Sequence, residues 1–134
     1  MAPIYFDPRY QHGRFSRNPS LSQLEHYILH DGSVFGDAAI YRGDYPSQPH
    51  LIILFDDGLG YYIKYLDGKS EWLSLHDSSR LTDVICPDDW NASAGLFVPP
   101  ALAWLTIAHF CETGERLKTQ EWISPDKMPE ESNW

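Results

Sequence analysis

The sequence predicts an α+β fold in which one mainly antiparallel sheet is packed with two helices. Three β-rich runs follow one another in a meander over about residues 50–76, at 51–55, 61–66 and 70–75. The turn signals Asp56-Asp57-Gly58-Leu59-Gly60 and Asp67-Gly68 separate them. Asp-Gly between two strands is a strong hairpin signal, because its tight turn needs positive φ at both central residues. We therefore expect this meander to form the centre of the sheet.

The second turn also predicts a register. If Asp67 and Gly68 are the only two turn residues, Lys64 lies opposite Glu71, and such an ion pair supports the pairing. The same count gives two further pairs: Tyr62 with Leu73, and Ile63 with Trp72. The run 51–55 is apolar without alternation, which predicts a strand covered on both faces.

The segment before the meander is expected to add a short edge strand at residues 4–6 and a helix over 20–30. Two residue pairs have capping-box spacing at the start of this helix, Ser20 with Gln23 and Ser22 with Glu25. Asp31-Gly32 is expected to end it. The apolar face of the helix consists of Leu21, Leu24 and Ile28. Residues 38–42 predict another strand.

After the meander, residues 76–95 contain only one short strand-like run, at 83–86. A loop of this length in a small domain is usually functional or contains a short strand. Pro99-Pro100 then opens a second helix that ends at Gly114 and is apolar around most of its girth, which predicts the main core element. A final strand is expected at 120–123. We assign residues 1–124 to a single domain and 125–134 to a loosely ordered polar tail.

Composition restricts the class of partner. The 134 residues carry 10 basic and 19 acidic side chains, for a net charge of −9, and 43% of the residues are hydrophobic. Such a chain can fold as one domain, but its charge repels nucleic acid and suits a basic protein. The acidity can alternatively serve solubility alone. No apolar run approaches the roughly 20 residues of a membrane span, and the first residues lack a signal-peptide core. We therefore expect a cytoplasmic protein without membrane or direct nucleic-acid contact.

No strong catalytic or metal-binding motif is visible. His26 and His30 have a spacing that can hold a metal on a helix, but no third ligand is evident. Cys86 and Cys111 lack the spacing of a metal or redox pair and are expected to be buried free thiols. We expect no cofactor and no enzymatic activity.

Two stretches together resemble a family of bacterial immunity proteins. Residues 98–122, VPPALAWLTIAHFCETGERLKTQEW, are similar to its C-terminal signature, in which an apolar helix ends in a Thr-Gly-Glu-like turn and a Trp follows. Residues 57–62, DGLGYY, are similar to its Gly/Tyr-bearing hairpin. Leu117 departs from the pattern, because members often carry Pro there. Members protect the producers of polymorphic toxins, especially toxins of the nucleic-acid deaminase superfamily.

The resemblance implies an immunity protein that binds a cognate toxin domain and occludes its active site. It assigns no interface residues, because immunity proteins bind through surfaces that diverge with the toxin. From the residues themselves we expect two acidic loop tips to make the contact, since loops carry recognition and Trp is a favoured anchor. The first tip is Asp88, Asp89 and Trp90, and the second is Asp56, Asp57 and Tyr61.

Two alternatives remain open at this point. The chain could be a small cytosolic enzyme that uses the 76–95 loop, for example by pairing Cys86 with His76 or His109. It could also be a module that binds a small ligand or carbohydrate through the aromatic residues Tyr61, Tyr62 and Trp72. A toxin reading frame beside the gene favours the immunity protein, and a metabolic operon favours the enzyme.

Overall fold

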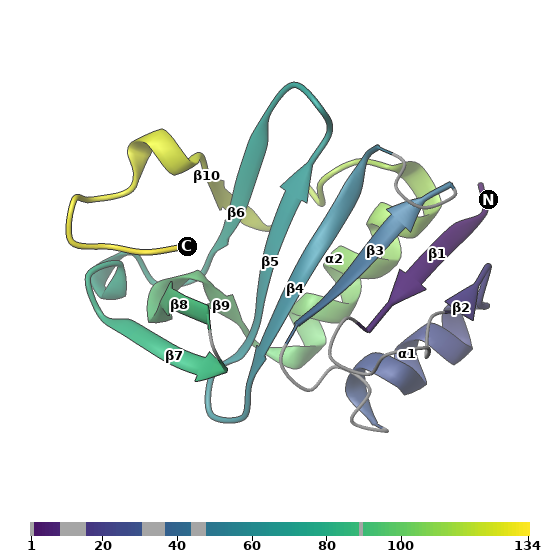
Figure 1. The fold of residues 1–134 in the computed structure, drawn as a ribbon, viewed down its shortest axis with the longest axis horizontal. Coiled ribbons are helices and arrows are strands. Elements are labelled where there is room, and N and C mark those ends of the chain that lie inside the picture. The colour runs from purple at the N-terminus through teal and green to yellow at the C-terminus, as the bar shows by residue number, and fades with distance from the viewer. Residues whose placement is uncertain (1, 9–15, 31–36, 44–47, 89) are drawn as a thin grey trace.

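The expected α+β architecture is confirmed by a computed structural model that describes residues 2–8, 16–30, 37–43, 48–88 and 90–134. The main sheet has the order β10-β6-β5-β4-β3-β1-β2, β9 pairs with β5, and all pairings are antiparallel (Figure 1). Its strands are β1 (Ile4–Asp7), β2 (Ser16–Arg17), β3 (Asp37–Arg42), β4 (His50–Asp56), β5 (Gly60–Leu66), β6 (Glu71–Leu75), β9 (Phe97–Val98) and β10 (Glu121–Ile123). The helices are α1 (Leu21–Leu29) and α2 (Pro100–Thr113).

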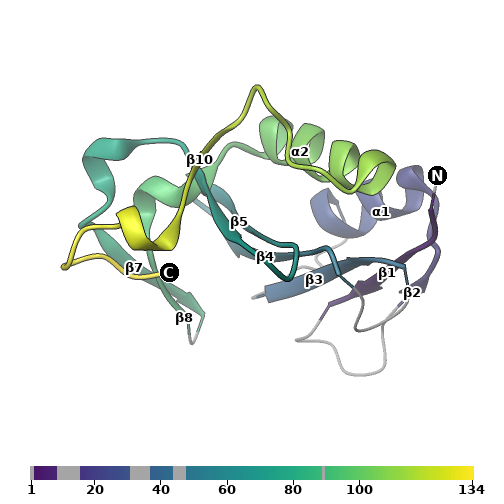
Figure 2. The same ribbon diagram turned by 90° about the horizontal axis from the view of Figure 1, so that it is seen from above.

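Both helices cover the same face of the sheet (Figure 2). The core between them contains Ile53 and Ile63 from the sheet together with Ile107 and Phe110 from α2. A second cluster lies on the opposite face, where Leu54 packs with residues of β5, β6 and β9. Because Ile53 and its neighbour Leu54 belong to different clusters, β4 is covered on both faces, as its unbroken apolar run predicts.

The predicted register of the β5–β6 hairpin is wrong by two residues. Leu66 pairs with Glu71, and Lys64 pairs with Leu73 instead of with Glu71. The predicted pairs of Tyr62 with Leu73 and of Ile63 with Trp72 are wrong for the same reason. Since the shift is an even number, each side chain stays on its predicted face. Lys64 therefore still reaches Glu71 diagonally, with 3.7 Å between the charged atoms.

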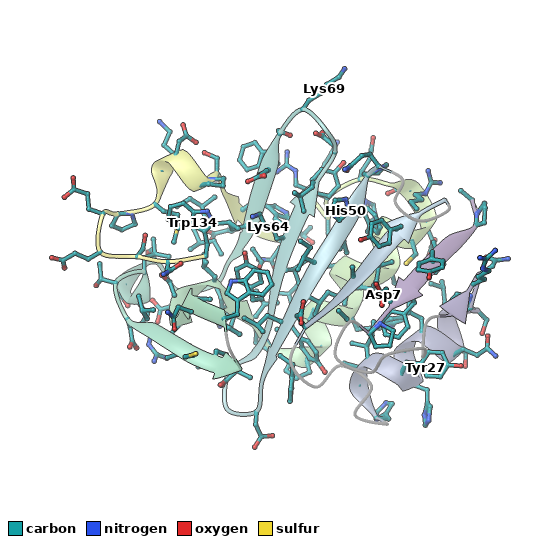
Figure 3. The ribbon with its side chains drawn as sticks, in the orientation of Figure 1. Asp7, Tyr27, His50, Lys64, Lys69 and Trp134 are labelled. Carbon is teal, nitrogen blue, oxygen red and sulfur yellow. The ribbon has the colours of Figure 1, made fainter. Side chains whose placement is uncertain are left out.

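The cause is the side chain of Asp67. Its carboxylate accepts hydrogen bonds from the backbone N–H of Lys69 at 2.9 Å and of Ser70 at 2.7 Å. These bonds stabilise a four-residue turn, which places Lys69 at its tip (Figure 3). Within this turn only Gly68 has a positive φ, at 87°. The expected tight turn needs two residues with positive φ, so it does not form.

A buried serine joins the strands where β6 diverges from β5 and β9 enters beside it. β9 pairs with the first half of β5 and β6 with the second half. Ser74 lies at this fork, where its hydroxyl accepts from Ile63 N at 2.9 Å and donates to Leu96 O at 2.7 Å. Its side chain thus completes the backbone hydrogen bonding that the two partner strands leave open.

The N-terminal elements agree with the predictions except at the edge of the sheet. Ser20 and Gln23 form the capping box of α1, and Leu24 and Ile28 are its buried residues. The expected helix end at Asp31-Gly32 lies outside the described residues. The run 4–6 forms part of β1, which pairs on both sides with β2 and β3 and is therefore not an edge strand.

Helix α2 ends as predicted at Gly114, whose φ of 76° is the left-handed conformation that favours glycine. Arg42 from β3 reaches the last turn, where its Nη2 donates to Glu112 O at 3.3 Å. A cation at this position also complements the negative end of the helix dipole. Only one side of the helix is buried, however, and Leu105 on the outer side is 60% exposed.

The 76–95 segment contains two strands rather than one short run. A 3-10 turn (Ser78–Arg80) leads into an antiparallel hairpin of β7 (Val84–Asp88) and β8 (Trp90–Ser93), and a second 3-10 turn (Ala94–Leu96) joins the hairpin to β9. The backbone of Gly95 lies directly against that of Asp77, and its carbonyl accepts from Asp77 N at 3.0 Å. Glycine is required there because a Cβ atom would lie 2.1 Å from Asp77 O.

The C-terminal segment, expected to be loosely ordered, folds back against β8 (Figure 1). Ser93 N donates to Asn133 O at 2.9 Å, and Met128 packs against the second hydrophobic cluster. Neither helix of the described residues has the length and apolar character needed to cross a membrane.

Candidate partner-binding site

The two predicted acidic tips lie at the same end of the main sheet. The turn 56–60 joins β4 to β5 (Figure 1). The Trp90 ring packs beside this start of β5, with its centroid 5.5 Å from that of the Tyr62 ring. Helix α2 begins at the same end, because Gly60 lies directly against the backbone of Val98 and Pro99. Three separate segments therefore meet at this end of the sheet.

Within the 56–60 turn, the two aspartates have different roles. The Asp56 carboxylate accepts from the backbone N–H of Gly58 at 3.0 Å and of Leu59 at 2.9 Å, so it holds the turn together. Asp57 is exposed at the tip. Of the pair, Asp57 is the carboxylate that is free to meet a partner, and Asp56 shapes the loop that presents it.

Tyr61 is not a surface residue, which corrects the prediction that placed it in the interface. It is 3% exposed, and its hydroxyl donates to Ile28 O of α1 at 2.8 Å. Burial raises the pKa of this phenol to about 12. Tyr61 therefore joins the sheet to α1 and contributes to the core.

Trp90 is half-buried, so one part of the ring packs on the second cluster and the rest is accessible. Its ring plane makes an angle of 60° with that of Tyr62. The backbone of Asp88 pairs with Trp90 across the hairpin, and Asp89 lies outside the described residues. Trp90 thus has the rigid packing that an aromatic anchor needs, although part of its area is already used within the fold.

An apolar surface at the start of α2 was not assigned to the site from the sequence. Pro99, Pro100 and Ala101 are exposed there, and the surface continues along the helix to Leu105. One sequence feature could have predicted this exposed surface. Helix α2 is apolar around most of its circumference, and such a helix is normally covered on all sides. We define the end patch as Asp57, Trp90, Pro99, Pro100, Ala101 and Leu105. The patch extends around this end of the sheet, because Trp90 packs on the face opposite the helices and Ala101 and Leu105 lie on the outer side of α2.

The aromatic residues of the ligand-binding alternative do not share one surface. Tyr61 and Trp72 pack in the cluster beneath the helices, whereas Tyr62 packs in the cluster on the other face. Tyr61 and Tyr62 are also fully buried. Alternation along β5 separates the neighbouring tyrosines, and both faces of this strand are covered.

The structure also shows where the cysteines proposed for the enzyme alternative lie. Neither Cys86 nor Cys111 is in a disulfide, but Cys86 is exposed, contrary to the expectation of two buried thiols. Burial of Cys111 raises its pKa to about 12, so it is a neutral thiol at physiological pH. Helix α2, which carries His109, and strand β7, which carries Cys86, lie on different sides of the sheet (Figure 2).

Two of the carboxylates in the 76–95 segment have structural partners. Asp77 accepts from Ser79 N at 3.0 Å and caps the first 3-10 turn. Asp83 pairs with Arg80 at 2.6 Å. Over the residues that the structure describes, no three His, Cys, Asp or Glu side chains form a group suited to a metal ion.

No protein-family model matches this chain, and no curated protein is significantly similar to it in sequence.

Proposed function

We propose that this protein is an immunity protein that binds a basic toxin domain and blocks its active site, without catalytic activity of its own. The observation that carries the proposal is the end patch, which combines an exposed carboxylate, a partly accessible Trp and an uncovered apolar helix start. Protein interfaces commonly have this composition, with an apolar aromatic centre and a polar rim. The resemblance of residues 57–62 and 98–122 to immunity proteins points to the same class of partner.

The charge of the chain supports a nucleic-acid-acting toxin as the target. A toxin that grips phosphates must present Lys and Arg around its cleft, and a nucleic-acid deaminase is one such enzyme. A protein of net charge −9 is attracted to that cleft and meets it faster than a neutral protein would. On this proposal the complex forms in the cytoplasm of the toxin-producing cell.

The test is to search the reading frames beside the gene for a toxin domain, to co-express the chain with that domain, and to measure association and dissociation rates at several salt concentrations. Asp57→Lys should slow association and flatten its salt dependence, because the exposed charge acts at long range. Trp90→Ala should mainly speed dissociation, by an amount equivalent to about 2 kcal/mol or more.

Glu130→Lys is the matched control for the charge change, because Glu130 is exposed in the C-terminal segment and lies outside the end patch. It should leave the rates close to those of the wild type. Melting temperatures of all variants separate a lost contact from a lost fold. Unchanged affinity in both Asp57→Lys and Trp90→Ala would show that the partner binds elsewhere.

A further inference from the structure

Arg116, in the loop between α2 and β10, lies among three aromatic rings. Its Cζ is 4.0 Å from the centroid of the Trp72 ring, 5.8 Å from that of Trp122 and 6.0 Å from that of Tyr65. A guanidinium within about 6 Å of a ring centroid is held by a cation–π attraction. Within the described part of the chain, no carboxylate forms an ion pair with Arg116. Its N–H donors are therefore available.

The rings and the loop fix one another. The Tyr65 hydroxyl donates to Gly114 O, and Trp122 Nε1 donates to Leu117 O, both at 3.0 Å. These two bonds tie the loop at points on either side of Arg116. The guanidinium is thus positioned in advance, which lowers the entropy that a ligand must spend to use it.

A cavity of about 440 Å³ opens beside this cluster, a size within the range of small-molecule sites. Its wall includes Tyr65, Trp122 and Arg116, with Lys118 at its exposed side. Tyr65 and Asp67 in its lining place the cavity at the C-terminal end of β5, whereas the end patch lies at the start of that strand.

Two acidic side chains also line the cavity, Asp67 and Glu115. The Asp67 carboxylate already accepts from the backbone of its own turn, and those bonds lower its pKa. The lining thus carries two basic and two acidic groups. This balance disfavours a polyanion such as nucleic acid, and it leaves Arg116 as the contact for a ligand with a single anionic group.

We propose that this cavity binds a small aromatic oxyanion, meaning a molecule that carries a flat ring together with one carboxylate or one phosphate group. The guanidinium held over the Trp72 ring offers its fork of N–H donors for a bidentate bond to two oxygens. Lys118 adds charge at the rim, and the flat ring packs against Trp122 and Tyr65.

The test is a titration followed by ¹⁵N NMR on the full chain. Benzoate and AMP are the two oxyanion probes, and the neutral compounds benzamide and adenosine are their matched controls. The indole N–H of Trp122, assigned with Trp122→Phe, reports on the cavity because it donates to the loop that carries Arg116. We expect saturable shifts of this signal with benzoate or AMP, and the tighter of the two identifies the oxyanion.

Two arginine variants separate binding from folding. Arg116→Gln should weaken the affinity at least tenfold, as should Arg116→Lys, which keeps the charge but loses the fork. Arg80→Gln removes an arginine outside the cavity and should bind as the wild type does. Absence of saturation with both anions, equal binding of the neutral probes, or unchanged affinity in a folded Arg116→Gln would overturn the proposal. Because the end patch lies at the other end of β5, none of these results bears on toxin binding.

Discussion

Ser74→Ala should be among the most destabilising single-atom changes in this chain. The hydroxyl of Ser74 is fully buried and bridges two strands, accepting from Ile63 N at 2.9 Å and donating to Leu96 O at 2.7 Å. Alanine leaves both backbone groups without a partner in a site that water does not reach. A buried unsatisfied group costs about 1–3 kcal/mol, so the two together predict a loss of about 2–4 kcal/mol after partial relaxation.

Urea denaturation followed by tryptophan fluorescence measures this loss as a fall in midpoint at constant slope. Ser22→Ala is the matched control, because Ser22 is exposed on α1 and its replacement should change stability by less than about 0.5 kcal/mol. If Ser74→Ala also loses less than about 0.5 kcal/mol, the hydroxyl does not complete the hydrogen bonding at the fork. The described junction of β5, β6 and β9 would then be incorrect.

Three further changes probe the core. The raised pKa of Tyr61, about 12 against an ordinary value of 10.0, means that the unfolded chain loses this proton first. The free energy of unfolding should therefore fall as the pH rises from 10 towards 12, and Tyr61→Phe, which also removes the bond to Ile28, should reduce that fall in alkaline urea titrations. Gly95→Ala should cost at least about 2 kcal/mol in the same melts, because its methyl would overlap Asp77 O, and a neutral result would contradict that close approach. Phe110→Ala should lose about 3–5 kcal/mol, since the ring is 1% exposed, and a loss below about 1 kcal/mol would mean that it does not fill the core.

The elements that sequence reasoning located correctly are those with strong local signals. The helix α2 has Pro at its start and Gly at its end, and both signals act within one turn of the backbone. The capping box of α1 is similarly local, although two serines had the required spacing and only Ser20 forms it. For these segments, the nearest few residues determine the conformation.

The errors arise where a side chain or a distant strand decides the geometry. The Asp67 carboxylate accepts hydrogen bonds from the amides of its own turn, and these bonds lengthen the turn by two residues. The Asp-Gly pattern predicts a two-residue turn and does not indicate this competing bond. The strand β7 contains Pro87 and shows no clear alternation, so its pairing with β8 depends on the tertiary fold.

The site was only partly predictable for a related reason. Asp57 and Trp90 are 33 positions apart in the chain, and only the sheet places their segments at one end. Tyr61 was misplaced because the burial of β5 on both faces cannot be read from two adjacent tyrosines. The exposure of Leu105 depends on which side of α2 meets the sheet, and a helix that is apolar all round does not specify that side.

Hydrogen–deuterium exchange on the complex with the toxin domain identified by co-expression tests the central claim most directly. If the end patch is the interface, bound toxin should slow amide exchange in the turn 56–60, at Trp90 and along residues 101–105. The loop 114–118, at the far end of β5, should exchange at its free rate and serves as the internal reference. Slowed exchange confined to that loop, or unchanged exchange throughout the end patch in a saturated complex, would contradict the proposed mode of binding.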